Sequence, residues 1–256
     1  MNIVFIGSGN VATQMAPALK ENGHDILCVY SRSIINAKAL SNILGCNYCN
    51  KVQDIPSNAD LYIVTLQDDF IEKIINQLNF QPACIVHTSG SKPLDIFPKR
   101  FMNTGVIYPL QTFTKNRKTN WATLPIFIEG NNSKSRVSVS KVAHSLSKNV
   151  QKANSLKRQQ MHLAAVFANN FVNHLYSLSS ELLKNEKISF DVLKPIILET
   201  TERILSADPA KIQTGPAKRK DFTTIKKHLN LLKADKNKLK VYKTITESII
   251  HTTKSK

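Results

Sequence analysis

The chain has 256 residues, 42% of them hydrophobic, and a formal net charge of +17. This length suits one large or two modest domains with a sizeable core, and no apolar run reaches the roughly 18–20 residues that would span a bilayer. The apolar N-terminus has no basic lead and is taken up by a predicted strand, so we expect a cytoplasmic protein without a signal peptide.

The excess positive charge lies entirely after Thr112. The first 112 residues carry 8 Lys+Arg and 8 Asp+Glu, and the remainder carries 27 and 10. A basic part of this kind can attract nucleic acid or a membrane surface. Its lysines, however, are scattered over predicted helices and form no stripe interleaved with aromatic residues, which argues against nucleic acid. An anionic substrate explains some of the charge more naturally.

The chain begins with a predicted strand, a glycine-rich turn and a helix. Residues 2–6 are mostly apolar, they lead into Gly7-Ser-Gly-Asn-Val-Ala12, and a helical pattern then runs to Asn22-Gly23. In a dinucleotide fold the first glycine permits a tight turn, and the second lets the backbone approach the pyrophosphate at the helix N-terminus. An ordinary strand–turn–helix is the alternative. The predicted cofactor-binding residues of this turn are Gly7, Ser8, Gly9, Asn10 and Val11.

The end of the second predicted strand, residues 25–30, indicates which dinucleotide binds. An NAD site usually has an acidic side chain there that accepts from the ribose hydroxyl. This chain instead has Ser31, Arg32 and Ser33, a cation between two hydroxyl groups, which suits a 2′-phosphate. A solvated loop arginine is the alternative. We therefore expect NADP as the cofactor.

The rest of the first part alternates strands with helices. Strands are predicted at residues 60–66, 83–87, 105–108 and 125–129, and helices at residues 36–44, 70–78 and 135–146. Apolar strands separated by helices imply a parallel sheet covered on both faces. Cys46 and Cys49 have the C-x-x-C spacing but no second pair and no nearby histidine, so we expect reduced thiols and no metal site.

The pattern changes near residue 155. Between residues 158 and 183, apolar positions recur at alternating spacings of three and four, as in a helix packed against other helices. Further helices are predicted over residues 189–205, with a kink at Pro195, and over residues 222–232 and 235–251. We expect a break at Asp208-Pro209 and Asp221 as an N-cap. The predicted fold is α/β: residues 1–154 form a Rossmann domain with a doubly wound parallel sheet, and residues 155–256 form an all-helical domain.

Polar side chains follow the predicted strands at the edge where open α/β sheets bind ligands. Leu66 and Gln67 are predicted to contact the cofactor, and Asp68 or Asp69 to cap the next helix. His87 and Ser89 follow the strand at residues 83–87, and either could donate a proton or hydrogen bond. Pro109 and Gln111 follow the next strand and are predicted to contact substrate. Turn formation is the alternative for both loops.

Two segments of the helical part are also candidates. His162 and Asn170 lie on a polar side of the long predicted helix together with Asn169 and Asn173, and asparagine is a poor helix former. A solvated face or interhelical hydrogen bonds are the alternative. Arg219 lies in a loop at residues 213–221 and could bind a carboxylate or phosphate bidentately.

Together these segments resemble a family of Rossmann-like reductases that join an NADP-binding domain to a helical domain of unknown function. The resemblance covers nearly the whole chain, and Gly-Pro-Ala-x-Arg-x-Asp at residues 215–221 is its most specific part. The family is similar to pyrroline-5-carboxylate reductase, ketopantoate reductase and 6-phosphogluconate dehydrogenase, whose C-terminal domain the helical part would resemble. The resemblance implies a homodimer formed through the helices, with substrate between the domains. The helix lysine of the hydroxyacid relatives has no counterpart between Arg158 and Lys184.

The function predicted from the sequence is NADPH-dependent reduction of a small anionic carbonyl or imine compound. Ser89, His87, His162 and Asn170 are the candidate catalytic residues. Pro109, Gln111 and Arg219 are the candidate substrate-binding residues. The alternative is a non-catalytic NADP-binding sensor or interaction protein.

Overall fold

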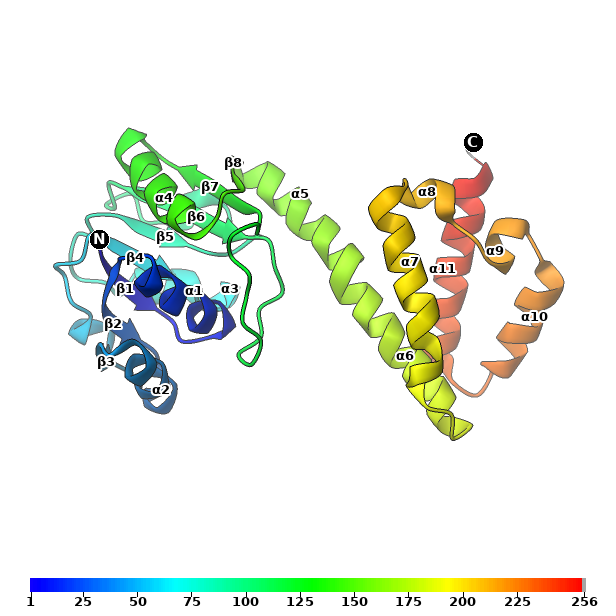
Figure 1. Ribbon diagram of the computed structural model, residues 1–256. Coiled ribbons are helices and arrows are strands. Elements are labelled where there is room, and N and C mark those ends of the chain that lie inside the picture. Colours follow the sequence, from blue (N-terminus) through cyan, green and yellow to red (C-terminus); the bar gives the residue numbers. More distant parts are fainter. Residues whose placement is uncertain (255–256) are drawn as a thin grey trace. The chain divides into compact units, whose positions relative to one another are not determined.

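The structure is a computed structural model that describes residues 1–254, and it consists of two compact units, Met1–Ala168 and Asn169–Lys256 (Figure 1). Helix α5 (Ser155–Ala165) begins at the boundary predicted between residues 154 and 155, whereas the two units divide after it. The predicted domain boundary stays a prediction.

The first unit is built on one eight-stranded sheet with the order β3-β2-β1-β4-β5-β6-β7-β8. The strands are β1 (Asn2–Ile6), β2 (Asp25–Tyr30), β3 (Asn47–Cys49), β4 (Leu61–Val64), β5 (Ile85–His87), β6 (Thr104–Pro109), β7 (Ile126–Gly130) and β8 (Val150–Lys152). All neighbouring strands are parallel except β6 and β7. The predicted parallel-dominated sheet is confirmed. Strands β3 and β8 and the antiparallel direction of β7 were not predicted from the sequence.

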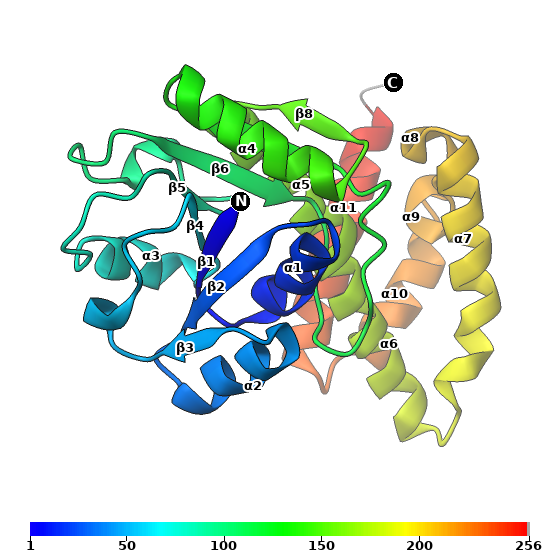
Figure 2. The same ribbon diagram turned by 60° about the vertical axis from the view of Figure 1, so that its left-hand side comes forward.

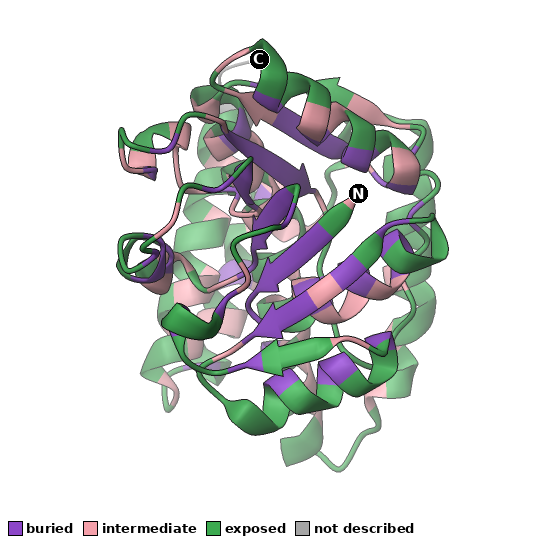
Figure 3. Cartoon of the chain, turned by 90° about the vertical axis from the view of Figure 1, so that its left-hand side faces the viewer, coloured by how far each residue is buried: buried purple, intermediate pink, exposed green. Residues whose placement is uncertain are grey.

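Helices cover both faces of the sheet. Alternate side chains of each central strand point to opposite faces, so each strand contributes to the core on both sides. Ile3 and Phe5 of β1 pack with residues of α1 (Asn10–Glu21), α2 (Ile34–Leu44) and α4 (Ser133–Leu146). Val4 and Ile6 of the same strand pack with residues of α3 (Asp68–Ile75) and with Val52 of the short helix η1 (Val52–Asp54). Figure 2 shows α1 and α4 over one face, and Figure 3 shows the buried strands between outward-facing, exposed helix surfaces. The Rossmann-type doubly wound architecture is therefore confirmed.

Local sequence signals account for the ends of several helices. Gly45 ends α2 in the left-handed conformation at φ 61°, as expected of a glycine that terminates a helix. Asn132 and Ser135 form a capping box at the start of α4. Cys49 lies in β3 with its Sγ 3.7 Å from that of Cys28 on β2, and both thiols are buried as small apolar groups.

The second unit is all-helical, as predicted. Its elements are α6 (Val172–Asn185), η4 (Phe190–Leu193), α7 (Lys194–Ser206), α8 (Pro209–Ile212), α9 (Pro216–Arg219), α10 (Phe222–Leu231) and α11 (Lys236–Lys254). Between α5 and α6 the helix has a π-helical stretch, η3 (Val166–Phe171), that crosses the division between the units. Leu178, Ala217, Ile225 and Leu232 are the hydrophobic side chains of this unit that are buried among the described residues.

The helix boundaries of this unit agree with the prediction at Asp208 and Asp221 and differ from it at Pro195. The break at Asp208-Pro209 and the N-cap at Asp221 are confirmed, and the Asp221 carboxylate accepts from Thr224 N at 3.0 Å. The kink at Pro195 is wrong: Pro195 lies in the first turn of α7, where its missing N–H costs nothing. The predicted loop before Asp221 contains the short helix α9.

A buried ion pair attaches α5 to the sheet. Arg158 is 1% exposed; its Nη1 donates to Glu129 on β7, and its Nη2 donates to Lys92 O at 2.5 Å in the loop after β5. Glu129 also accepts from the backbone N and the Oγ of Ser155, the first residue of α5. The pair therefore joins β7, the β5 loop and the start of α5.

Glu129→Ala should lower the free energy of unfolding of the first unit by about 3 kcal/mol, because it leaves the Arg158 charge buried without its partner. Urea denaturation measures the loss. Arg136→Ala is the matched control, since Arg136 is exposed and its guanidinium donates to the backbone at Gly130 O, and it should change stability by less than about 0.5 kcal/mol. Equal effects of the two substitutions would contradict this assignment.

Candidate functional site

The glycine loop between β1 and α1 requires its first glycine. Gly7 has φ +125°, and a Cβ there would lie 2.6 Å from Thr65 Oγ1 at the end of β4. Its N–H donates to Tyr30 O at 2.8 Å, which joins the loop to the end of β2. The chain therefore has room only for glycine at this position.

Gly9 has a different environment. It is the N-cap residue of α1 with φ −77°, no side chain caps the helix, and a Cβ would meet only Thr65 O at 3.8 Å. Neither backbone strain nor a protein neighbour requires glycine here, so the space beside Gly9 is open in front of free helix N–H groups. Such an open, uncapped helix start fits a phosphate. The side chain of Asn10 is engaged by the loop after β6, since its Nδ2 donates to Phe113 O at 2.9 Å.

The end of β2 carries an oriented arginine. The guanidinium carbon of Arg32 lies 3.8 Å from the ring centroid of Phe70 on α3, which holds the exposed side chain by a cation–π contact. Ser31 N donates to Cys49 O at 3.1 Å, and Ser33 caps α2 by accepting from Asn36 N. A positioned guanidinium beside Ser31 suits a phosphate monoester.

The loop after β4 differs from the prediction. Gln67, not Asp68 or Asp69, is the N-cap residue of α3, and no side chain caps it. The carboxylate of Asp68 instead accepts from Ser91 Oγ in the neighbouring loop. The predicted cap is therefore wrong, and Asp68 stabilises the turn after β5. Leu66 is half-buried and Gln67 exposed at the same edge of the sheet.

The turn after β5 is held by its own polar side chains. Ser89 Oγ accepts from Ser91 N at 3.2 Å and Lys92 N at 3.0 Å, and it lies 3.3 Å from Ser91 Oγ. Because the Ser91 hydroxyl donates to Asp68, the proton of Ser89 is directed to Ser91. Ser89 was predicted as a catalytic hydroxyl, and the structure gives it a role in forming this turn.

His87 is fully buried, with both ring nitrogens bound. Nδ1 accepts from Ser89 N at 3.2 Å, Nε2 lies 3.2 Å from Pro93 O, and the ring stacks on Phe97. Burial, reinforced by the nearby Arg158 charge, lowers the pKa of His87 to about 3. The imidazole is therefore neutral at physiological pH and does not suit the predicted role of proton donor.

Sequence reasoning did not single out Tyr108, the partner of His162. Tyr108 Oη lies 3.1 Å from His162 Nδ1, and both residues belong to the first unit. Burial raises the pKa of the Tyr108 hydroxyl. The only signal in the sequence was the position of Tyr108 at the end of a predicted strand.

The long loop between β6 and β7 contacts α1. Gln14 donates to Thr114 O at 2.9 Å and accepts from Thr119 N at 3.2 Å, so this loop lies beside the helix that the glycine turn begins. Pro109, the last residue of β6, is buried, and Gln111 lines a polar cavity of about 400 Å³. Arg117 and Lys118 line the same cavity.

Asn170 and Arg219 lie in the second unit. Asn170 is exposed within the π-helical stretch η3, a type of distortion that is frequent at functional sites. Arg219 is exposed at the end of α9, and its guanidinium makes no hydrogen bond or ion pair with the described residues. The predicted meeting of these two residues with those of the first unit stays a prediction.

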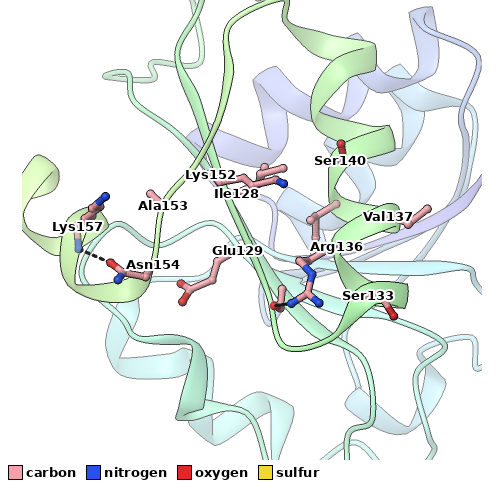
Figure 4. Close-up of a pocket in the computed structure, with 12 residues that line it drawn as sticks. Ile128, Glu129, Ser133, Arg136, Val137, Ser140, Lys152, Ala153, Asn154 and Lys157 are labelled. Carbon is pink, nitrogen blue, oxygen red and sulfur yellow. Dashed lines mark hydrogen bonds between the residues drawn. The ribbon is translucent and has the colours of Figure 1, made fainter.

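A cavity of about 630 Å³ lies elsewhere (Figure 4). It is lined by Gly130 of β7, Arg136 of α4 and the residues that connect β8 to α5. Gly130 pairs with Gly105 at the start of β6, so the cavity is at the amino edge of the parallel strands, opposite the glycine loop. It is therefore separate from the candidate dinucleotide site.

The geometry gathers the predicted residues of the first unit at one edge. Ile6, Tyr30, Val64 and His87 end four adjacent parallel strands, so the loops after them lie side by side. No group of three or more metal-ligating side chains occurs among residues 1–254. Within the same range, no helix combines the length and apolar character that crossing a membrane requires. The fold and this edge define a Rossmann-type, dinucleotide-binding class of protein.

Comparison with known proteins identifies the family. Residues 2–89 match the model described as NADP oxidoreductase, coenzyme F420-dependent, and residues 124–249 match a domain of unknown function, DUF2520. A Bacteroides fragilis protein provisionally assigned as an NADP oxidoreductase is 37% identical, with a TM-score of 0.90 and 98% of each chain covered. The chain therefore belongs to the family of NADP oxidoreductases that combine a Rossmann-like domain with this C-terminal domain. The resemblance and the NADP cofactor are confirmed at the level of the family.

More distant structures share the fold. A pyrroline-5-carboxylate reductase from Streptococcus pyogenes is 16% identical, with a TM-score of 0.65 and 100% of this chain and 99% of that chain covered. An imine reductase from Myxococcus stipitatus, solved with NADP⁺, is 13% identical, with a TM-score of 0.65 and 100% and 95% covered. Among curated proteins, none matches the sequence significantly.

The buried, neutral His87 should make stability depend on pH. Its pKa is about 3 in the folded protein against 6.5 ordinarily. The contribution of the neutral ring to the free energy of unfolding is therefore complete above pH 6.5. It is lost as the pH falls from 6.5 toward 3, because in this range the unfolded chain binds a proton that the folded protein does not. Between pH 7.5 and 5 the wild type should lose about 2 kcal/mol more than His87→Gln. Urea denaturation at both pH values measures this difference, and parallel losses would contradict the assignment. The contribution of His24, whose pKa is also lowered by burial, cancels between the two proteins.

Proposed function

We propose that the protein is an NADPH-dependent reductase of a small, anionic carbonyl or imine compound. The observation that carries this proposal is the arrangement of one edge of the sheet. The open helix start at Gly9 and the oriented guanidinium of Arg32 lie at the same edge as the Tyr108–His162 pair. A site for an anionic dinucleotide thus lies at the same edge as groups that can transfer a proton.

The residues of this edge fit NADPH, whose chemistry when bound is to supply a hydride. Gly7, Ser8, Gly9, Asn10 and Val11 form the loop that would accept the pyrophosphate at the N-terminus of α1. Ser31, Arg32 and Ser33 would hold the 2′-phosphate, and Leu66 and Gln67 would flank the dinucleotide at the end of β4. No carboxylate follows β2 to favour NADH in their place.

On the substrate side, we assign proton donation to His162 in preference to His87 and Ser89, whose polar atoms are engaged within the β5 turn. Pro109 and Gln111 would contact the substrate from the loop after β6, and Asn170 would do so from the π-helical stretch. Arg219, with its unengaged guanidinium, would hold the substrate anion, because its planar fork matches a carboxylate.

We also propose a homodimer formed through the helical unit. Ile196, Leu198 and Leu205 of α7 are 63%, 62% and 84% exposed. Several large apolar side chains exposed on one helix are typical of a surface that another protein covers. Light scattering of the purified protein would measure its mass, and a monomer at micromolar concentration would contradict this assignment.

Arg32→Ala should weaken NADPH binding about ten-fold or more and leave NADH binding unchanged, because a charge-assisted hydrogen bond to the 2′-phosphate is worth about 1.5–3 kcal/mol. Fluorescence titration of each dinucleotide measures both constants. Arg136→Ala, at the opposite edge of the sheet, is the control and should change neither. Equal losses for NADPH and NADH would contradict the assignment of the 2′-phosphate.

The activity itself is tested by following NADPH oxidation with panels of keto acids, aldehydes and cyclic imines. We expect turnover of an anionic member, and Arg219→Lys should raise its KM several-fold while leaving NADPH affinity unchanged, since lysine lacks the planar fork. Tight NADPH binding without turnover of any compound would instead support a sensor. An unchanged KM in Arg219→Lys would remove Arg219 from the substrate site.

A further inference from the structure

A phenol and an imidazole meet at the carboxyl edge of the sheet. Tyr108 is the penultimate residue of β6, and its Oη lies 3.1 Å from Nδ1 of His162 on α5. The rings meet edge to face, with centroids 6.0 Å apart and planes 75° apart. The distance of 3.1 Å between Oη and Nδ1 is that of a hydrogen bond.

The loop after β5 packs directly against this pair. A Cβ at Gly90 would lie 2.7 Å from Tyr108 Cζ and 2.8 Å from His162 Cγ, so only glycine allows the backbone to come this close. Gln159, one turn before His162 on α5, donates from Nε2 to Ser91 O at 2.8 Å. The loop and the pair therefore hold one another in place.

The two nitrogens of the His162 ring differ in what they contact. Nδ1 is held by Tyr108, whereas Nε2 has no hydrogen-bond partner in the part of the chain that the structure describes, and the side chain is half-buried. In His87 both nitrogens are bound. Of the two histidines predicted as proton donors, His162 alone keeps a free nitrogen.

We infer that His162 is the proton donor of the reduction and that Tyr108 is the residue that positions it. This inference rests on the proposed function. A hydroxyl group accepts from Nδ1–H of an imidazolium and of a neutral imidazole that keeps its proton on Nδ1. The Tyr108 hydrogen bond therefore persists in both protonation states, and Nε2 carries the transferable proton.

Reduction of a C=O or C=N bond requires one hydride and one proton. The substrate carbon accepts the hydride from the reduced dinucleotide, which is thereby oxidised, and the π electron pair moves to the oxygen or nitrogen. The Nε2–H bond of the His162 imidazolium breaks, and its proton goes to that atom. The neutral ring keeps its proton on Nδ1, which continues to donate to Tyr108 Oη, and solvent returns a proton to Nε2.

Four charged side chains lie on α5, on β7, in the loop after β5 and on α3. Arg158 lies one turn before His162 on α5 and is paired with Glu129 of β7. Lys92 lies in the loop after β5, and Asp68 at the start of α3 is bound by Ser91. Burial raises the pKa of Tyr108 and the Arg158 guanidinium opposes this rise. The substitutions used below leave all four charges in place.

The kinetic test compares two single variants with their combination. His162→Gln should lower kcat about 100-fold or more, the usual contribution of a general acid, and leave the Kd of NADPH within about two-fold. Tyr108→Phe should lower kcat about ten-fold. The double variant should be no slower than His162→Gln, because a residue that acts through another adds nothing once that other is gone. Losses that multiply would overturn the positioning role, and full activity of His162→Gln would overturn the donor role.

Tyr62→Phe is the matched control for a buried phenol. Tyr62 Oη donates to Pro56 O at 2.8 Å and accepts from Ala59 N at 3.2 Å, so its loss should lower stability without changing kcat. The pH profile gives a second readout. In the wild type kcat/KM should fall as His162 loses its proton; this limb should shift in Tyr108→Phe and disappear in His162→Gln. An unshifted limb in Tyr108→Phe would overturn the positioning role.

A measurement without substrate separates this inference from the proposed function. In ¹⁵N-histidine-labelled protein, neutral His162 should carry its proton on Nδ1 in the wild type and populate both tautomers in Tyr108→Phe. Identical ¹⁵N shifts in the two proteins would overturn the positioning role. If no carbonyl or imine is reduced by the wild type, the proposed function and the donor role fail together, while the tautomer measurement still decides the role of Tyr108.

Discussion

The buried guanidinium of Arg158 is the constraint on which the first unit most depends. It joins β7, the loop after β5 and the first turn of α5 through Glu129, Lys92 O and Ser155. Its Nε is buried and has no hydrogen-bond partner among the described residues. The ion pair with Glu129 therefore offsets a considerable cost of removing the guanidinium from water, and it tolerates little displacement. His162 follows Arg158 by one turn on the same face of α5. The contact between His162 and Tyr108 is therefore a consequence of where Arg158 is held.

The same charge helps to determine which groups can exchange protons. Arg158 adds to the effect of burial in keeping His87 neutral, and the neutral ring is bound at both nitrogens within the β5 turn. Ser89, Ser91 and Asp68 form a hydroxyl-to-carboxylate chain in the same turn. His87 and Ser89, two of the four residues that the sequence suggests for catalysis, thus form the rigid support, and His162 with its partner Tyr108 is left as the candidate proton donor.

The elements predicted well from the sequence are those whose signals are local. The glycine turn, the strand at residues 2–6, the helix end at residue 44 and the Asp221 cap each follow from a few adjacent residues. The reversal of β7 and the short strands β3 and β8 depend on pairing with distant residues, which hydrophobic periodicity does not reveal. An acidic residue at the start of a helix, such as Asp68, looks the same in the sequence whether it caps the helix or binds another loop. Its contact with Ser91 spans 23 residues. The Tyr108–His162 contact spans 54 residues, so no sequence window contains both.

Charge is unequally distributed along the first unit. Residues 113–168 carry 10 Lys+Arg and a single acidic residue, Glu129. Because Glu129 is engaged by Arg158 and Ser155, no carboxylate of this stretch is left to neutralise the nine other cations. A surplus of this kind creates a positive field that speeds the association of anions and is screened by salt. Glu129 therefore anchors α5 locally, while the surplus of nine positive charges in this stretch favours the approach of an anion such as a dinucleotide.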